Sequence, residues 1–267
     1  MIFKKISWFF KRHPFLYVAR FKLLSRNSSV DEINSQNYNK TNQKKDIPDY
    51  FNSVNDTIFN GNQFTSPFEN VKHLSVWLQN NIKGGPGLSE ASDDALRIML
   101  SGKGGVCSDM AQIFNNFCVI NDIKVREWGN TRAPFDRSYG GHSFNEVFVE
   151  KLNKWVLIDV SSSLVFYHNE QLLSVIELYD LVRNKEKVSF KTFNANKNLD
   201  EKNIERNYLN PNIIPFLICN YSNKFYDSCL KFFRPYIPVF LVHFIIFVLG
   251  KSYHYKFPID NYKKIFK

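Results

Sequence analysis

Residues 102–128 read GKGGVCSDMAQIFNNFCVINDIKVREW and carry the clearest chemical signal of the chain. A glycine-rich turn leads into Cys107, after which small and apolar residues recur at the spacing of one helix face. We therefore expect a helix that begins at Cys107. A thiol at a helix N-terminus lies near the positive end of the helix dipole and near unpaired backbone N–H groups, and both favour the thiolate. Gly104 and Gly105 would leave room for a substrate backbone beside this thiol.

The region after this helix alternates in polarity, as β-strands do. Residues 123–128 form one such segment, and residues 142–149 and 155–160 form two more. The last two are joined by a short polar connection, which predicts a β-hairpin. The loop over residues 129–141 precedes the hairpin and is long enough to cover a cleft.

A nucleophilic cysteine needs a base, and the base needs a group that orients it. His142 opens the first strand of the hairpin, and Asp159 lies near the end of the second. In an antiparallel pair joined by a loop of even length, these two residues fall on the same face. The spacing therefore permits a carboxylate–imidazole contact. The alternative is that Cys107 is a core residue, His142 a surface residue at a strand edge and Asp159 a turn former.

The order GGVCSDMA, then GGHSFNEVFV, then WVLIDV resembles the transglutaminase-like superfamily. The resemblance covers about residues 93–160 and implies an α+β, papain-like core with a Cys-His-Asp triad. In that core a helix bearing the cysteine packs on an antiparallel sheet bearing the other two. Carried over by position, Cys107 would be the nucleophile, His142 the general base and acid, and Asp159 the orienting carboxylate.

We add a substrate-binding set to this triad. It contains Gly104, Gly105, Trp128 and Gly141, although Trp128 also fits a core position. The implied chemistry is acyl transfer, or hydrolysis of an amide or peptide substrate, through a thioester on Cys107. We expect hydrolysis rather than protein crosslinking. The alternatives are an acyltransferase similar to the arylamine N-acetyltransferases and a non-catalytic module that binds a membrane or a partner.

The cysteine spacing and the charge distribution exclude several classes of protein. The four cysteines show neither a CxxC motif nor metal-ligand spacing, so we expect reduced thiols, no metal, no cofactor and a cytoplasmic protein. The net charge is +10, and the first 26 residues hold seven Lys or Arg and no acid. This distribution argues against a nucleic-acid groove and for one local basic arm.

The pattern along the chain predicts five segments. They are a basic amphipathic arm with helices (1–26), a polar linker (27–49), the transglutaminase-like domain (50–190), a second polar linker (191–212) and an apolar, aromatic extension (213–267). Within the domain we expect amphipathic helices after Pro67 and over residues 169–183.

Two segments have compositions that suit contact with a membrane. The basic, aromatic face of residues 1–26 suits an anionic membrane surface, or else a helix that docks on the domain. Residues 236–249 are uncharged and intensely apolar but shorter than the roughly 17–25 residues of a spanning helix. A buried core segment, an interfacial or re-entrant segment and a short or tilted span remain open for them. We expect a cytoplasmic protein, for which peripheral contact with the membrane is a further possibility.

Overall fold

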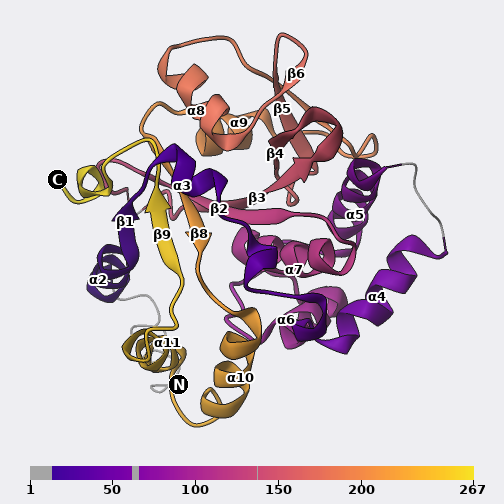
Figure 1. Cartoon of the computed structure of the whole chain (residues 1–267), viewed down its shortest axis with the longest axis vertical. Helices are drawn as coiled ribbons and strands as arrows, with labels where there is room; N and C mark the ends of the chain where they lie inside the picture. The colour runs from indigo at the N-terminus through magenta and orange to yellow at the C-terminus, as the bar shows by residue number, and fades with distance from the viewer. Residues whose placement is uncertain (1–13, 62–65, 137) are drawn as a thin grey trace.

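The fold is built on a mixed six-stranded sheet with the strand order β1-β9-β8-β2-β3-β4. A computed structural model describes residues 14–61, 66–136 and 138–267 (Figure 1). Within these residues only the β1–β9 pair is parallel. The strands are β1 (Ser25–Asn27), β2 (Val125–Arg132), β3 (His142–Val149), β4 (Lys154–Ile158), β8 (Ile213–Cys219) and β9 (His254–Phe257). The helix expected over residues 2–13 lies outside the described residues.

The predicted hairpin is present as β3 and β4. Asn145 pairs with Ile158 and Val149 with Lys154, so the loop between the strands is even in length. His142 and Asp159 therefore fall on the same face, as the parity argument requires. Strand β2 continues four residues beyond its expected end at Trp128. The added residues pair with β3 as far as Asn130 and with β8 as far as Arg132.

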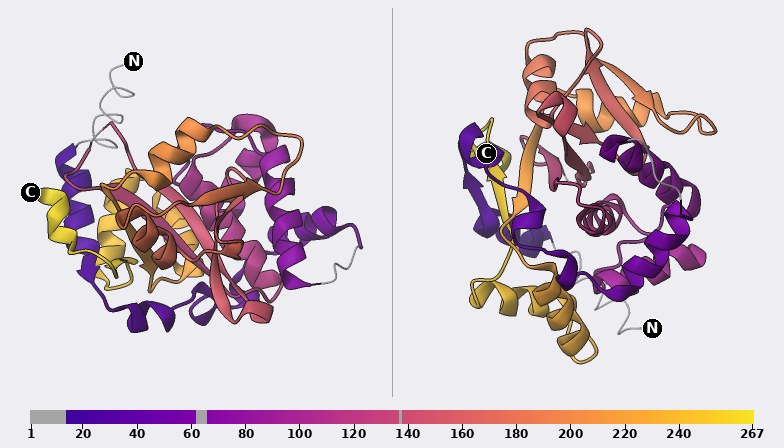
Figure 2. Two further views of the ribbon diagram at one scale, coloured as in Figure 1. Left: turned by 90° about the horizontal axis from the view of Figure 1, so that it is seen from above. Right: turned by 45° about the vertical axis from the view of Figure 1, so that its right-hand side comes forward.

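Four helices of the described ranges cover one face of this sheet (Figure 2). Helix α7 (Cys107–Ile120) packs directly on β2 and β3, with the apolar side chains of Met110, Phe114 and Phe117 buried. Around it lie α4 (Asp49–Phe59), α5 (Pro67–Asn81) and α6 (Ser92–Ile98), which is followed by the short helical turn η3 (Met99–Lys103). Figure 2 shows α7 enclosed between the sheet and these outer helices. The expected helices from Cys107 and from Pro67 are both observed.

The other face packs on a smaller layer. It contains α8 (Val175–Arg183) and a three-stranded sheet of β6 (Gln171–Leu172), β5 (Leu164–His168) and β7 (Ser189–Thr192). The helix expected from residue 169 begins later, because Asn169 and Glu170 adopt positive φ in a tight turn and Ser174 caps α8. Trp128, Phe144 and Phe166 are fully buried in this second core.

Both segments interpreted as polar linkers are folded, which corrects that interpretation. Residues 27–49 contain α3 (Val30–Asn34), η1 (Tyr38–Lys40) and η2 (Lys44–Asp46), and residues 191–212 contain α9 (Glu201–Ile204) and η5 (Glu205–Leu209). Each is held by a few buried anchors, namely Ile33, Tyr38, Ile47, Ile204 and Tyr208. Isolated apolar anchors in a polar stretch make no periodic pattern, so the sequence alone indicated a linker.

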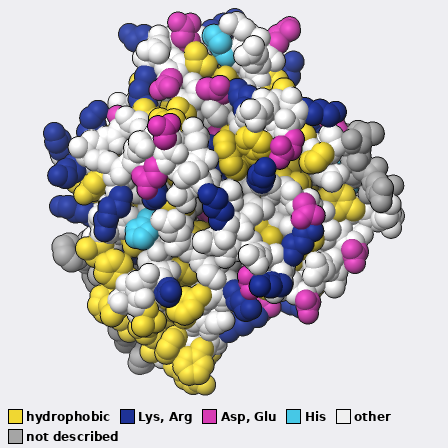
Figure 3. Space-filling view, viewed as in Figure 1, with side chains coloured by type: hydrophobic (Ala, Val, Ile, Leu, Met, Phe, Trp, Pro, Cys, Tyr) yellow, Lys and Arg dark blue, Asp and Glu magenta, His cyan; other side chains and the backbone are white. Residues whose placement is uncertain are grey.

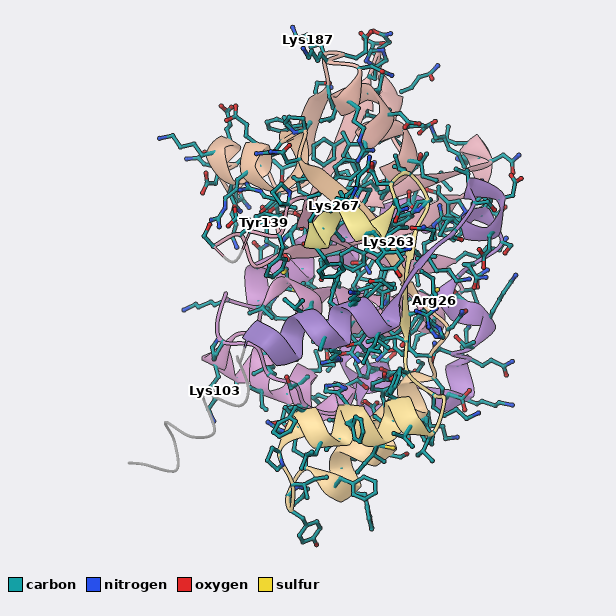
Figure 4. The ribbon with its side chains drawn as sticks, turned by 90° about the vertical axis from the view of Figure 1, so that its left-hand side faces the viewer. Arg26, Lys103, Tyr139, Lys187, Lys263 and Lys267 are labelled. Atoms are coloured by element: carbon teal, nitrogen blue, oxygen red, sulfur yellow. The ribbon has the colours of Figure 1, made fainter. Side chains whose placement is uncertain are left out.

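The C-terminal segment is also more than an extension. Strands β8 and β9 lie inside the main sheet, α10 (Asn223–Phe233) and α11 (Val239–Val248) lie beyond the ends of these strands (Figure 1), and η6 (Tyr262–Phe266) contacts β1. Helix α2 (Pro14–Leu24) lies next to α11 (Figures 1 and 4). In α11 Val242 and Ile246 are buried, whereas Phe244 and Val248 are 60% and 67% exposed. No helix of the described residues has the length and apolarity needed to cross a bilayer.

Candidate active site

The turn before Cys107 is fixed by backbone packing. Gly104 has φ 71° and ψ −171°, and a Cβ there would lie 2.6 Å from the Lys83 carbonyl oxygen. Gly105 pairs with Gly84 in an isolated bridge, and its carbonyl accepts a 2.9 Å hydrogen bond from the backbone N–H of Gly85. These contacts join two loops without side chains between them. Gly104 and Gly105 do not line the cavity at Cys107, so their expected part in substrate binding is corrected to positioning the turn.

Cys107 is the first residue of α7, and Asp109 caps this end of the helix. The Asp109 carboxylate accepts hydrogen bonds from the backbone N–H of Val106 at 3.0 Å and of Leu88 at 3.2 Å. The second of these also ties the neighbouring loop to the helix start. The thiol is thus held at an end of the helix where backbone N–H groups lack intrahelical partners.

His142 and Asp159 meet beside this thiol. His142 Nε2 lies 2.9 Å from Asp159 Oδ2, and Ser143 donates its backbone N–H to Cys107 Sγ at 3.4 Å. The contact with Asp159 occupies Nε2, which leaves Nδ1 as the ring nitrogen that can face the thiol. Strand β3 supplies the imidazole, the residue directly after β4 supplies the carboxylate, and α7 supplies the sulfur. The structure therefore brings together the three residues that the resemblance implied as a triad, and the His142–Asp159 contact is the one that the spacing permits.

The electrostatics of the three groups favour a charged pair. Burial raises the pKa of the Cys107 thiol, but the hydrogen bond and charge of His142 and the Ser143 N–H outweigh it, so this pKa lies below its ordinary value. Burial alone would lower the pKa of His142, but the Asp159 carboxylate and the thiolate raise it to about 10. Burial would raise the pKa of Asp159, but the charge and the hydrogen bond of His142 outweigh burial, so this pKa lies below its ordinary value. A thiolate–imidazolium pair is the consequence.

Tyr208 is a member of the site that sequence reasoning missed. Its hydroxyl donates to Asp159 Oδ2 at 2.8 Å and lies 3.1 Å from His142 Nε2, and its ring packs edge-on against the imidazole. Tyr208 belongs to η5, inside the segment taken for a linker. The one available signal was a lone tyrosine in the polar stretch ERNYLNPN.

A cavity of about 530 Å³ opens at the thiol and is lined by Cys107, His142 and Gly141. Gly141 has φ 87°, and a Cβ there would meet the Asn130 carbonyl oxygen at 3.0 Å, so a glycine suits this position. Trp128 does not reach the cavity: it is fully buried on the other face of the sheet. Its indole N–H donates to the carboxylate of Glu146 at 2.6 Å. The expected place of Trp128 in the substrate-binding set is therefore corrected to the core.

Glu127 places a buried carboxyl group in the wall of the same cavity. Its Oε2 accepts hydrogen bonds from Asn115 at 2.9 Å and from Tyr221 at 3.0 Å. Burial raises the pKa of Glu127 to about 7 against the lowering effect of these two bonds. The group therefore changes charge near neutral pH.

Cys107 is distinct among the four cysteines. All are free, and burial raises the pKa of Cys118, Cys219 and Cys229. No group of His, Cys, Asp and Glu side chains within the described ranges is arranged to hold a metal ion.

Comparison with known proteins places the site in a family. Residues 56–160 match the transglutaminase-like superfamily, so the predicted family is confirmed and this part of the chain is a transglutaminase-like core. The match contains all three residues of the Cys107 site. No curated protein matches the sequence.

Among solved structures, one from Cytophaga hutchinsonii, described as a "putative cysteine protease", is similar to this chain at 19% identity with a TM-score of 0.32. The similarity covers 42% of this chain and 37% of that one, so this chain spans little more than a third of that protein's length.

Proposed function

We propose that the protein is a cysteine-dependent amide or peptide hydrolase that acts through a thioester on Cys107. The observation that carries the proposal is the His142–Asp159 contact of 2.9 Å beside a thiol whose pKa lies below its ordinary value. A carboxylate that orients an imidazole, which in turn polarises a thiol, is the arrangement that nucleophilic catalysis needs.

The proposed reaction has two halves. The Cys107 thiolate attacks the substrate carbonyl carbon, and the backbone N–H of Cys107 stabilises the negative charge that forms on the carbonyl oxygen. The His142 imidazolium then gives its proton to the leaving nitrogen, the C–N bond breaks and the amine departs. In the second half His142 takes a proton from water, the hydroxide attacks the thioester, and the acid is released with the thiolate restored.

Two alternatives are distinguished by simple measurements. An acyltransferase similar to the arylamine N-acetyltransferases would bind acetyl-coenzyme A, which isothermal titration detects directly. A non-catalytic module would keep the fold without an activated thiol. Transfer to an added amine instead of water would produce a stable amide product, which separates transfer from hydrolysis.

The test of the proposal is the pH dependence of Cys107 alkylation by iodoacetamide. Because the pKa of the thiol is lowered by the protonated imidazole, we expect the rate to reach its plateau below the ordinary thiol range. His142→Gln should move this rise to higher pH, since the stabilising charge is lost. Cys107→Ala should abolish the fast phase, which assigns it to this residue.

The denatured chain provides the reference rate. If native Cys107 reacts no faster at pH 6 than the cysteines of the denatured protein, the hydrolase proposal is wrong and the non-catalytic module is favoured. If the thiol is activated but acetyl-coenzyme A acylates it, the acyltransferase replaces the hydrolase.

We further propose peripheral association with an anionic membrane surface. Exposed apolar side chains gather over α10 and α11 (Figure 3), and they are Phe232, Tyr236, Leu241, Phe244, Phe247, Val248 and Leu249. Lys251, which is exposed, lies two residues after Leu249, and the first 26 residues add seven cationic side chains. An apolar face beside cationic side chains suits a membrane with anionic headgroups.

Liposome flotation tests this second proposal. The full chain should float with vesicles that contain phosphatidylserine, and the double variant Phe244→Ser, Val248→Ser should not. Leu152→Ser is the matched control, because Leu152 is 49% exposed on the β3–β4 turn. Equal flotation of the double variant and the control would disprove the membrane contact. Removal of residues 1–13, rather than 1–26, tests the basic arm without removing β1 from the sheet.

A further inference from the structure

The cavity at Cys107 extends well beyond the thiol. Its volume of about 530 Å³ lies in the range of roughly 300–1,000 Å³ typical of sites that enclose small molecules. Besides Cys107 and His142, it is lined by Arg20 from α2 and by His243 from α11. A substrate bound there contacts more than the groups that react with its carbonyl.

Arg20 is a half-buried cation in this wall without a carboxylate partner. Its guanidinium lies over the ring of Tyr253, 5.2 Å from the centroid, and it makes no ion pair with the described residues. The remaining residues (1–13, 62–65 and 137) include no Asp or Glu, so they offer it no counter-charge. A guanidinium presents several N–H donors in one plane and binds carboxylates through two of them.

The acidic groups of the cavity are engaged elsewhere. Glu90 forms an ion pair with Arg234, and Asp109 accepts two backbone N–H groups. Glu127 is held by Asn115 and Tyr221. Arg20 is therefore left as the cation of this wall that can receive an anion.

His243 adds a second polar atom near Arg20. Its Nδ1 is buried and has no hydrogen-bond partner among the residues that the structure describes, and His243 belongs to α11, the helix next to α2 (Figure 4). Burial and the charge of Arg20 hold the pKa of His243 well below its ordinary value, so the ring is neutral and carries one N–H. A neutral imidazole in the same wall as the guanidinium can donate its N–H to a bound anion.

We propose that the cavity binds a carboxylate group of the substrate at Arg20, with Cys107 attacking an amide carbonyl of the same molecule. The inference rests on the proposed hydrolase function and deepens it: the substrate class becomes amides that also bear a free carboxylate. Arg20 is a specificity-determining residue in this scheme and takes no part in bond making.

The probes are chloroacetamides with a linear tail of varied length that ends in either a carboxylate or the matching primary amide. In each probe the Cys107 thiolate forms an S–C bond and chloride leaves. Both members of a pair share the same electrophile, so the ratio of their second-order inactivation rates reports binding of the carboxylate. We expect the wild-type chain to favour the acid by about tenfold or more at one tail length, as for a hydrogen-bonded charge pair.

Three variants of the full chain complete the experiment. Arg20→Gln should bring the acid-to-amide ratio close to one, whereas Arg20→Lys should keep part of the preference. Arg26→Gln is the matched control, because Arg26 is exposed at the far end of α2 (Figure 4), where its guanidinium donates to the Leu23 and Ser25 carbonyls. It should leave the ratio unchanged. The iodoacetamide rate of Arg26→Gln should equal that of the wild-type chain. For the Arg20 variants the acid-to-amide ratio is taken within each protein, so a change in thiol reactivity cancels.

The outcomes separate this inference from the proposed function. An activated thiol with no acid preference at any tail length, or a preference that survives in Arg20→Gln, overturns carboxylate binding at Arg20 and leaves the hydrolase intact. A thiol that reacts no faster than the denatured chain overturns both. If Arg20→Gln does not fold, Arg20→Lys decides the question. An acid preference that is smaller than in the wild-type chain supports carboxylate binding at Arg20, and an unchanged preference contradicts it.

Discussion

At the scale of single residues, the carboxylate that orients His142 is itself held from two sides. Asp159 receives the Tyr208 hydroxyl at 2.8 Å and the backbone N–H of Ser162 at 3.3 Å, in addition to the imidazole at 2.9 Å. Each bond favours the ionised carboxylate and fixes its direction. Tyr208 is therefore a positioning residue that acts through Asp159.

Tyr208→Phe should lower the rate of Cys107 acylation about tenfold, the effect of losing one hydrogen bond to a charged group. The pKa of Asp159 is depressed in the folded chain, so it stabilises the fold above its unfolded pKa and loses this effect as pH falls through the folded value. Without the hydroxyl the folded pKa rises toward the unfolded one, and the acid limb of the pH–rate profile should move to higher pH. A melt at neutral pH together with this profile is the measurement. If the variant is less stable but its acid limb does not move, Tyr208 contributes only packing and does not position Asp159.

Glu127 makes a second prediction at this scale. Its pKa is raised by burial to about 7 from the ordinary value near 4.5, so its contribution to stability is full below that ordinary value and is lost as pH rises through 7. Glu127→Gln removes the cost of ionisation and should stabilise the fold above pH 7 by at most about 3 kcal/mol. Urea unfolding at pH 5 and pH 8 measures the difference. An equal change at both pH values would contradict the assignment.

At the scale of elements, local patterns predicted those elements that carry their own signals. The β3–β4 hairpin and α7 have strict periodicities, and their side chains face the core without help from distant segments. Elements η5 and β8 have no such pattern. Tyr208 is one aromatic residue in a polar stretch, and Pro215 argues locally against a sheet strand. Pro215 is accommodated because β9 pairs only with residues 217–219 of β8, beyond the proline.

The turn before α7 gives the prediction for this scale. Gly104→Ala should destabilise the fold by at least about 1–3 kcal/mol, because Ala would adopt a disfavoured φ and its Cβ would lie 2.6 Å from the Lys83 carbonyl oxygen. Gly102→Ala is the matched control, because Gly102 has φ 84° but a Cβ there would have no atom of the described residues within 4 Å. The control should show the conformational cost alone, about 1 kcal/mol. Chemical unfolding and the Cys107 alkylation rate are measured on both, and equal losses in the two variants would show that the two loops need not touch.

At the scale of the whole molecule, the sheet draws its strands from both ends of the chain. The parallel pair β1–β9 joins residues 25–27 to residues 255–257, and β8 places residues 213–219 directly beside β2. A sequence read locally divides such a molecule at its polar stretches, because pairing across two hundred residues leaves no local trace. For this reason the local pattern predicts a separate domain over residues 50–190.

The division can be tested with a chain of residues 50–190 alone. It contains Cys107, His142 and Asp159, but it lacks β8, so β2 would become an exposed edge strand that pairs on one side only. It also lacks Tyr208, and the second core would lose Leu217, which pairs with Trp128. We expect this chain to bind a hydrophobic dye, to melt without a cooperative transition and to show no fast alkylation of Cys107. A chain of residues 14–267 keeps every described strand. It should therefore behave like the full protein, with little dye binding, a cooperative melt and fast alkylation of Cys107. Cooperative melting of the 50–190 chain would show instead that residues 50–190 are enough to form the core, and that the two ends of the sheet only add to its stability.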